Sequence, residues 1–175
     1  MATRSVRDAR PDDAAACSAL YAPYVLGSIA TFELEPPSVE EMARRIAAAQ
    51  ERHAWLVLED DGTVVGYAHG GPFKARPAYD WTCEVSIYMA VDHRGAGGGR
   101  ILYQALLDRL AGRGLRIAAA KMSEPNEASA GLHQALGFER VGTFHRVGWK
   151  FGGWRDVTWV QRDLVPGDGP PTMTR

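Results

Sequence analysis

A short run of glycines between a strand pattern and a helix pattern constrains this chain more than any other feature. The strand pattern is Cys83–Met89, the glycines lie within Arg94–Arg100, and a helical pattern begins at Ile101. Glycine has no Cβ, so a ligand can approach the backbone closely. The first turn of a helix offers amide N–H groups without partners and carries a partial positive charge. A strand, a glycine turn and a helix N-terminus together predict a binding site for a phosphate group.

The strand just before these glycines carries a carboxylate. Successive strand residues point to opposite faces of a sheet. One face of this strand is apolar and consists of Cys83, Val85, Ile87 and Met89. The other face presents Glu84, Ser86 and Tyr88, which could line a cleft with a carboxylate, a hydroxyl and a phenol. An ordinary solvent-facing side of a sheet would show the same pattern, so alternation alone makes Glu84 one candidate for a general base.

Size and charge favour one globular domain without nucleic-acid or membrane chemistry. The chain has 175 residues, of which 46% are hydrophobic and 23% charged, with a formal net charge of −1. These values are typical of a globular domain with its own core. The small net charge disfavours nucleic-acid binding, and no run approaches the roughly 18 apolar residues that a spanning helix needs. No apolar stretch follows Met1–Ser5, which disfavours a signal peptide.

The cysteines and histidines indicate neither a disulfide nor a metal site. Cys17 and Cys83 are far apart in sequence, and we interpret them as reduced, buried thiols of a cytoplasmic protein. The five histidines have no ligand-like spacing, and the chain has no Cys-x-x-Cys. We therefore expect a cytoplasmic protein that uses no metal.

The order of predicted elements indicates a mixed α/β sandwich in one domain. Ser38 and Glu41 form a capping-box pattern at the start of one helix. Asp60-Asp61-Gly62 is a turn sequence between two strands. We predict one domain over 1–165 and a disordered Pro- and Gly-rich tail over 166–175. In chain order the predicted elements are a strand at Val6, helices over 11–24 and from 39, strands over 54–59, 63–69 and 83–89, a helix over 101–113, a strand over 117–122, a helix over 126–136, and strands over 138–144 and 157–161.

Three further segments could contribute to a site. Asn126, Ser129 and His133 share one helix face, where they could bind a polar cofactor arm, although a lone helical histidine is often structural. The loop over 70–81 carries Lys74 and Arg76, which could hold an anionic group of a substrate. The aromatic segment over 149–156 could be a hairpin turn anchored by tryptophans, a wall of a substrate site, or a dimer contact.

Together these features resemble the GCN5-related N-acetyltransferases (GNATs). The family signature Gln/Arg-x-x-Gly-x-Gly/Ala, after the fourth strand, appears here as Arg94-Gly95-Ala96-Gly97-Gly98-Gly99. The later pattern, an Asn followed by a helix ending in Gly-Phe, runs from Asn126 to Phe138. The resemblance covers the chain from Val6 to about Leu164. It implies an acyl-CoA N-acyltransferase fold, with a mixed, mostly antiparallel sheet flanked by helices, and acetyl-CoA as co-substrate.

Longer strings are similar to the phosphinothricin and methionine sulfoximine acetyltransferases of that family. They are Gly71–Arg76 with Ala78–Thr82, Leu132–Phe138, and Lys150–Trp154 with Asp156. The resemblance implies that Glu84 is the general base of a direct transfer to a primary amine. At the position of His133 the wider family often has a Tyr that acts as the acid for the leaving thiolate. Whether His133 is an acid, a partner of Glu84 or a pocket residue is open.

The resemblance also implies binding residues for both substrates. The pantetheine arm would lie along Ile87–Met89, the diphosphate on the amides after Gly95, and Asn126 would contact the arm. The implied cofactor residues are Ile87, Tyr88, Met89, Arg94, Gly95, Ala96, Gly97, Gly98, Gly99, Arg100, Asn126 and Ser129. The implied substrate residues are Phe32, Lys74, Arg76, Tyr79 and Lys150.

The same resemblance implies a homodimer that acts on a small-molecule amine and confers herbicide or antibiotic resistance. Two alternatives remain from the sequence. The acceptor could be another amine, such as an amino acid, a polyamine or a protein N-terminus. The chain could instead be a catalytically silent acyl-CoA-binding module. A dinucleotide-binding oxidoreductase is disfavoured because the glycines do not have the Gly-x-Gly-x-x-Gly spacing.

Overall fold

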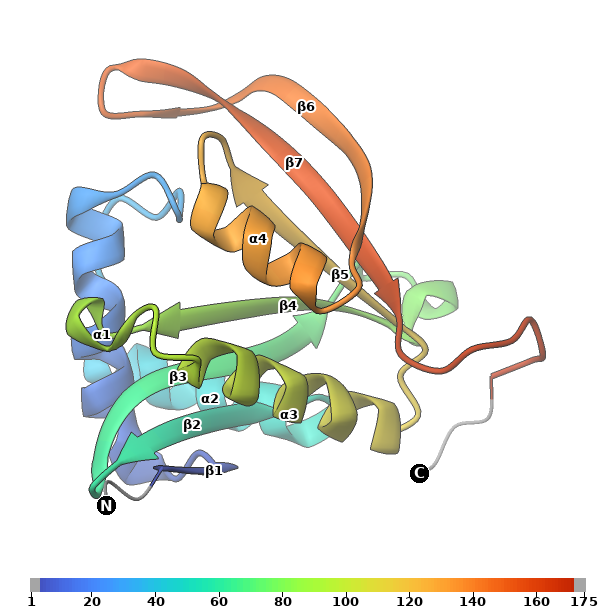
Figure 1. Ribbon diagram of the computed structural model, residues 1–175, viewed down its shortest axis with the longest axis horizontal. Helices are drawn as coiled ribbons and strands as arrows, with labels where there is room; N and C mark the ends of the chain where they lie inside the picture. The colour runs from blue at the N-terminus through green and yellow to red at the C-terminus, as the bar shows by residue number, and fades with distance from the viewer. Residues whose placement is uncertain (1–3, 172–175) are drawn as a thin grey trace.

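A central sheet organises the computed structural model, which describes residues 4–171 (Figure 1). Its seven strands lie in the order β1-β2-β3-β4-β5-β7-β6 among the described residues. All neighbouring strands are antiparallel except β4 and β5, which are parallel. The strands are β1 (Arg4–Asp8), β2 (Trp55–Asp60), β3 (Thr63–Pro72), β4 (Thr82–Met89), β5 (Ile117–Ser123), β6 (Glu139–Lys150) and β7 (Gly153–Asp163). The predicted mixed, mostly antiparallel α/β fold is confirmed.

The parallel contact between β4 and β5 is short. Only Thr82–Glu84 pair with Ile117–Ala119. Beyond these pairs the two strands diverge, as Figure 1 shows, and we call this place the β4–β5 fork. The fork divides the sheet into a wing of β1 to β4 and a wing of β5, β7 and β6.

Four helices lie around the sheet in the described residues. They are α1 (Ala14–Gly27), α2 (Val39–Arg52), α3 (Gly98–Gly112) and α4 (Glu127–Ala135), with short 3₁₀ turns at Pro11–Asp13, Pro77–Tyr79 and Val91–His93. In Figure 1, α3 crosses the front of β2 to β4, and α2 lies behind them. One core lies between α3 and the sheet, and a second core lies between the opposite face and α1 and α2. The two faces of β4 are therefore both covered.

Local sequence explains how two of these helices begin. The Oγ of Ser38 accepts a hydrogen bond from the Glu41 amide at 3.1 Å, which confirms the predicted N-cap of α2. The carboxylate of Glu41 does not complete a capping box, because it forms an ion pair with Arg45 at 2.9 Å. α3 begins at Gly98, three residues earlier than predicted, after Gly97 adopts a left-handed conformation with φ of 79°.

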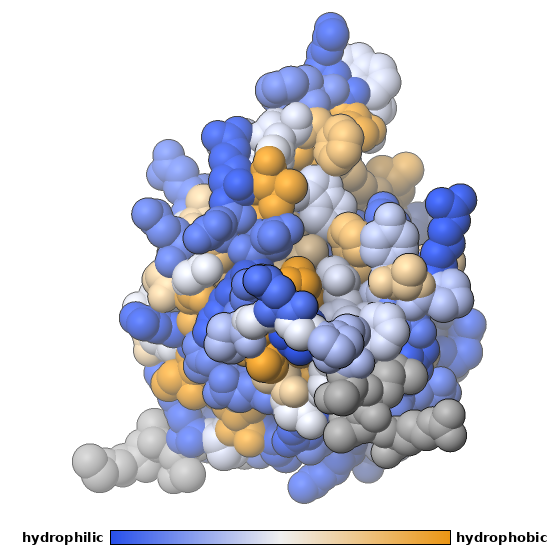
Figure 2. Space-filling view, turned by 90° about the vertical axis from the view of Figure 1, so that its right-hand side faces the viewer, coloured by the Kyte–Doolittle hydropathy of each residue, from blue (hydrophilic) through white to orange (hydrophobic). Residues whose placement is uncertain are grey.

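The β6–β7 hairpin is longer than the sequence pattern suggested. It extends over Glu139–Asp163 and turns at Phe151 and Gly152, both with positive φ. In the space-filling view of Figure 2 it stands above the rest of the molecule, with apolar and polar residues side by side. Residues 166–171 form no helix or strand, and 172–175 lie outside the described residues, so the boundary at 165 stays a prediction. Among residues 4–171, no helix is both long and apolar enough to cross a membrane.

Candidate active site

A cavity of about 1120 Å³ opens on the α1–α2 side of the sheet, and Glu84 lines it. We call it the Glu84 cavity. Ser86 and Tyr88 line it too, whereas Cys83 and Val85 belong to the core beneath α3. The predicted alternation is therefore confirmed, and the polar face of β4 is not an ordinary solvent-facing surface. The remaining walls come from β2, β3, β5, β6, β7, α1, α2 and the segment after α1.

A lysine that the sequence analysis did not single out contacts the proposed base. Lys121 Nζ lies 2.7 Å from a carboxylate oxygen of Glu84, whose side chain is 23% exposed. Glu84 is in register with Ala119, so Lys121, two residues farther along β5, points to the same face. Lys121 is the one charged residue of β5, whose neighbours Ala120 and Met122 enter the core. That contrast was the available sequence signal.

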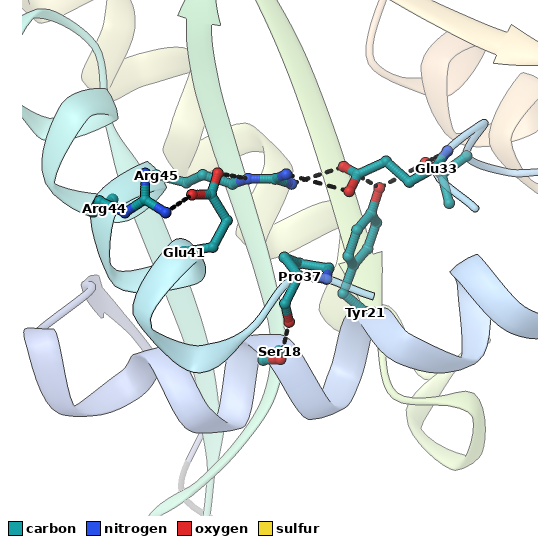
Figure 3. Close-up of polar contacts among 8 residues, drawn as sticks. Ser18, Tyr21, Glu33, Pro37, Glu41, Arg44 and Arg45 are labelled. Carbon is teal, nitrogen blue, oxygen red and sulfur yellow. Dashed lines mark hydrogen bonds and ion pairs between the residues drawn. The ribbon is translucent and has the colours of Figure 1, made fainter. Parts of the chain in front are cut away.

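Polar residues that are mostly half-buried form another wall of the Glu84 cavity, and Figure 3 shows contacts among them. The Arg45 guanidinium contacts Glu33 at 2.7 Å and Glu41 at 2.9 Å. The Tyr21 hydroxyl donates to Glu33 at 3.1 Å and shares a hydrogen bond with Thr31 at 2.6 Å. The hydrogen bond that Arg45 donates to Glu33 raises the pKa of Arg45 above its ordinary value, so the guanidinium stays charged and is paired with two carboxylates. Sequence reasoning missed these residues because they come from three separate segments.

The floor of the cavity is aromatic. His69 stacks on Trp55 with ring centroids 4.4 Å apart, and Tyr67 stacks on the same indole at 5.0 Å. Burial lowers the pKa of His69 to about 4, so its imidazole is neutral at physiological pH. His69 therefore contributes a flat neutral surface rather than a charge.

The main chain at the end of β4 points toward the β4–β5 fork. Ala90 N donates to Val65 O at 2.8 Å. In an antiparallel ladder the main-chain groups of successive residues point to opposite sides, so those of Tyr88 also bond to β3, while those of Ile87 and Met89 point away from β3. The Tyr24 hydroxyl takes both main-chain groups of Met89, accepting from its N–H at 3.1 Å and donating to its C=O at 2.6 Å. The N–H and C=O of Ile87 face the place where β5 no longer pairs.

The glycine turn has the geometry that an anion site requires. Gly95 and Gly97 have φ of 77° and 79°, which residues with a Cβ rarely adopt. A Cβ on Gly98 would lie 2.8 Å from Leu58 Cδ2, so glycine lets the start of α3 approach β2. The Arg94 guanidinium lies 4.8 Å from the Tyr24 ring centroid. The first amides of α3 therefore start beside the fork, where they can bind an anionic group.

The predicted residues of α4 are also used inside the protein. Asn126 caps the helix, and its Oδ1 accepts from the Ser129 amide at 3.1 Å. Its other amide atom is left for a ligand, so contact of Asn126 and Ser129 with the cofactor arm stays a prediction.

His133 lies apart from the Glu84 cavity. Its side chain is 4% exposed, packs edge-on against Phe138, and is absent from the cavity lining. Nδ1 lies 2.7 Å from the Ser129 carbonyl, which can only accept, so Nε2 accepts from the Tyr103 hydroxyl at 3.0 Å. Burial lowers the pKa of His133. A role as a partner of Glu84 does not fit this position, whereas a role in holding α4 against α3 does.

Of the predicted substrate residues, Phe32 lines the cavity. Its ring lies on the backbone of Gly148, where an added Cβ would come within 2.3 Å of it. Lys74, Arg76 and Tyr79 are exposed on the segment after β3 and do not line the cavity. That segment nevertheless lies beside the cavity, because Phe73 contacts both Tyr79 and the lining residue Trp159.

The prediction that Lys150 binds the substrate is wrong. Its side chain is 2% exposed, and Nζ donates to Val25 O at 2.7 Å and Thr31 O at 2.8 Å. Burial disfavours the charged form and lowers the pKa of Lys150. The ammonium ties β6 to the segment after α1, so Lys150 supports the cavity wall from behind.

Comparisons with known proteins agree with this geometry. Residues 6–159 match the family model described as an acetyltransferase (GNAT) domain. The chain is 39% identical to a phosphinothricin N-acetyltransferase of Streptomyces viridochromogenes, over 97% of this chain and 92% of the relative. It is 37% identical to an L-methionine sulfoximine/L-methionine sulfone acetyltransferase of Pseudomonas aeruginosa, over 95% and 98%.

A solved structure points the same way. The phosphinothricin acetyltransferase of Sinorhizobium meliloti in complex with acetyl-CoA superimposes with a TM-score of 0.93 at 36% identity, over 97% of this chain and 94% of that one. Among residues 4–171, no cluster of three or more His, Cys, Asp or Glu side chains could hold a metal ion. The fold, the glycine turn beside the fork and these similarities together show that the chain is an acyltransferase that uses acetyl-CoA and belongs to the GNAT acetyltransferase family.

Proposed function

We propose that this protein transfers an acetyl group from acetyl-CoA to the primary amine of a small amino-acid-like acceptor, with Glu84 as the general base. One observation carries the proposal: Glu84 projects into a cavity from the strand whose end meets the glycine turn. The named substrates of the relatives, phosphinothricin and methionine sulfoximine, are the acceptors that we expect to react.

The chemistry of the acceptor amine requires a base. An alkyl ammonium has no lone pair to attack a thioester, so a proton must leave before or during the attack. Glu84, directly or through one water, accepts that proton. The C–N bond then forms, the C–S bond of the thioester breaks, and CoA leaves as a thiolate that takes up a proton. The amides of Tyr88 and Met89 are engaged by β3 and by Tyr24, so we assign the Ile87 amide as the donor to the developing oxyanion.

Acetyl-CoA is proposed to lie in the β4–β5 fork, on the α3 side. Ile87 offers its main-chain carbonyl to an extended amide-bearing arm, the amides that follow Gly95 face the diphosphate, and Asn126 with Ser129 lies across the fork. This arrangement brings the thioester to the edge of the Glu84 cavity, because β4 borders both the fork and the cavity.

A direct transfer is favoured over an acyl-enzyme. Burial raises the pKa of both Cys17 and Cys83 to about 12, so neither thiol is a ready nucleophile. Initial rates measured with both substrates varied should give intersecting double-reciprocal lines. Parallel lines, together with a trapped acetyl-cysteine, would contradict the direct transfer.

The acceptor assignment is tested by thiol release from acetyl-CoA. We expect release with phosphinothricin and with methionine sulfoximine, and much weaker release with spermidine or an N-terminal peptide. Strong release with the latter two alone would assign the protein to another amine. Calorimetric binding of CoA without thiol release from any amine would indicate a silent binding module.

We also propose a homodimer in which the β6–β7 hairpin contacts a second copy. Six large apolar side chains on it are more than half exposed: Val141, Phe144, Val147, Trp149, Phe151 and Trp154. β6 is an edge strand that pairs with β7 only, among the described residues. Light scattering should give twice the chain mass, and Trp149→Glu with Trp154→Glu should give a monomer. A parent protein that is a monomer at assay concentration would contradict this proposal.

A cytoplasmic location and a role in resistance follow from the same proposal. Acetyl-CoA is a cytoplasmic metabolite, and acetylation removes the positive charge of the acceptor amine. Expression of the protein in a phosphinothricin-sensitive bacterium should raise the tolerated dose, and the Glu84→Gln variant should not.

A further inference from the structure

Lys121 is a cation at the place where the acceptor amine must sit. Its Nζ is 2.7 Å from Glu84, and its side chain is 53% exposed. It lies on β5 just beyond the fork, above the ring of Trp159 at 5.5 Å. Building a positive charge beside a base that must receive a cationic ammonium is unfavourable unless the acceptor also carries an anion.

We propose that Lys121 binds the α-carboxylate of the acceptor and thereby selects α-amino acids over simple amines. This inference rests on the acetyl transfer proposed above. An α-amino acid carries its ammonium and its carboxylate on one carbon, so the two groups can contact Glu84 and Lys121 at once. A lysine ammonium has three N–H donors, and the contact with Glu84 leaves donors for a carboxylate.

The other cations of the Glu84 cavity are held elsewhere. Arg45 is bound by Glu33 and Glu41, and Arg52 contacts Asp80 at 3.3 Å. Lys121 is the cation whose ion pair, among the described residues, is with Glu84. Lys121 is therefore the cation that can bind a carboxylate next to the reacting nitrogen.

The exposed cations after β3 would serve a different group. Lys74 and Arg76 lie outside the cavity lining. They can meet a second anionic or polar end of a longer acceptor, such as the phosphinate of phosphinothricin. Lys121 then recognises the amino-acid head, and the exposed pair recognises the tail.

A matched pair of acceptors tests this assignment. L-Methionine sulfone and 3-(methylsulfonyl)propan-1-amine differ only by the α-carboxylate. The parent protein should prefer the amino acid in kcat/KM, mainly through KM. In Lys121→Met this preference should fall at least about tenfold, since a charge-assisted hydrogen bond is lost. Lys121→Arg should restore part of it, because the guanidinium also binds carboxylates.

Each outcome decides. An unchanged preference in Lys121→Met, or equal losses with both acceptors, overturns the inference and leaves the proposed function intact. A parent that acetylates the amine as well as the amino acid also overturns it. A parent that releases no thiol with either compound overturns the inference, and one that also releases none with phosphinothricin or methionine sulfoximine rejects the proposed function itself. Acetyl-CoA binding by calorimetry, which should match the parent, confirms that the Met variant is folded.

Discussion

The two sides of β4 differ in how their residues are distributed along the chain. The side that we propose for acetyl-CoA is built mainly from one continuous stretch, Cys83 to Arg100, with the start of α4 across the fork. The Glu84 cavity is built from all strands from β2 to β7, α1, α2 and the segment after α1. The donor of the acetyl group is invariant in its chemistry, so a compact local motif can bind it. The acceptor side can change one wall at a time without disturbing that motif.

The largest effect on activity should come from a change of Glu84, which lies at the boundary of the two sides. Glu84→Gln removes the base but keeps the shape of the side chain. We expect kcat/KM to fall by about 10²–10⁴-fold, with an unchanged affinity for acetyl-CoA in calorimetry. A loss of acetyl-CoA binding in the same variant would show that the two sides are not separable at Glu84. An activity close to that of the parent would exclude it as the base.

The next effect should be confined to the acetyl-CoA side. Gly97 has a positive φ, so Gly97→Val strains the turn by about 1–3 kcal/mol. We expect the KM for acetyl-CoA to rise about tenfold, while the KM for the acceptor stays constant. Gly112→Ala, at the last residue of α3, is the control, because a Cβ there meets nothing within 4 Å. Equal effects of the two variants would contradict a specific role for the turn.

A smaller effect should be confined to the Glu84 cavity. Gly148→Ala forces a Cβ against the ring of Phe32, which must move within the cavity wall. We expect the KM for the acceptor to rise about fivefold, as overpacking typically costs 1–3 kcal/mol, with no change for acetyl-CoA. Gly142→Ala, on the same strand with open space at its Cβ, should match the parent. A change in the KM for acetyl-CoA would break the comparison.

The smallest effect concerns stability on the cavity floor. The folded protein keeps His69 neutral down to a pKa of about 4, whereas the unfolded chain takes up the proton near 6.5. The contribution of the neutral His69 to the free energy of unfolding is therefore complete above pH 6.5 and is lost as the pH falls toward 4. His69→Gln should unfold in urea with a weaker pH dependence across this window. The same slope in parent and variant would show that other groups dominate the acid limb.

Sequence reasoning recovered the side of the site that is local in the chain. The strand over 83–89, its alternation and the glycine turn depend on neighbours within a few residues, and the structure confirms each. α3 was placed three residues late because Gly98 and Gly99 have low helix propensity, which the close approach to Leu58 overrides. Here packing, not propensity, decides where the helix begins.

The remainder depends on contacts that no local pattern encodes. Lys150 was expected to bind the substrate because Lys150–Trp154 resembles a family motif, yet the main-chain carbonyls that accept its hydrogen bonds come from more than one hundred positions earlier. Lys121 faces Glu84 only because β5 pairs with β4 in one register. Arg45 and Glu33 meet through the fold of the segment between α1 and α2.

Three residue pairs hold the two wings of the sheet together edge to edge. A molecule bound in the fork would contact both wings, so its binding would add to the free energy of unfolding. In a metabolically active cell the enzyme would then have a higher free energy of unfolding than the purified protein without ligand. Starvation lowers the concentration of the acetyl donor, so this stabilisation would be lost and the chain would be cleaved by proteases more readily. The lifetime of the enzyme would then depend on the supply of its own reactant.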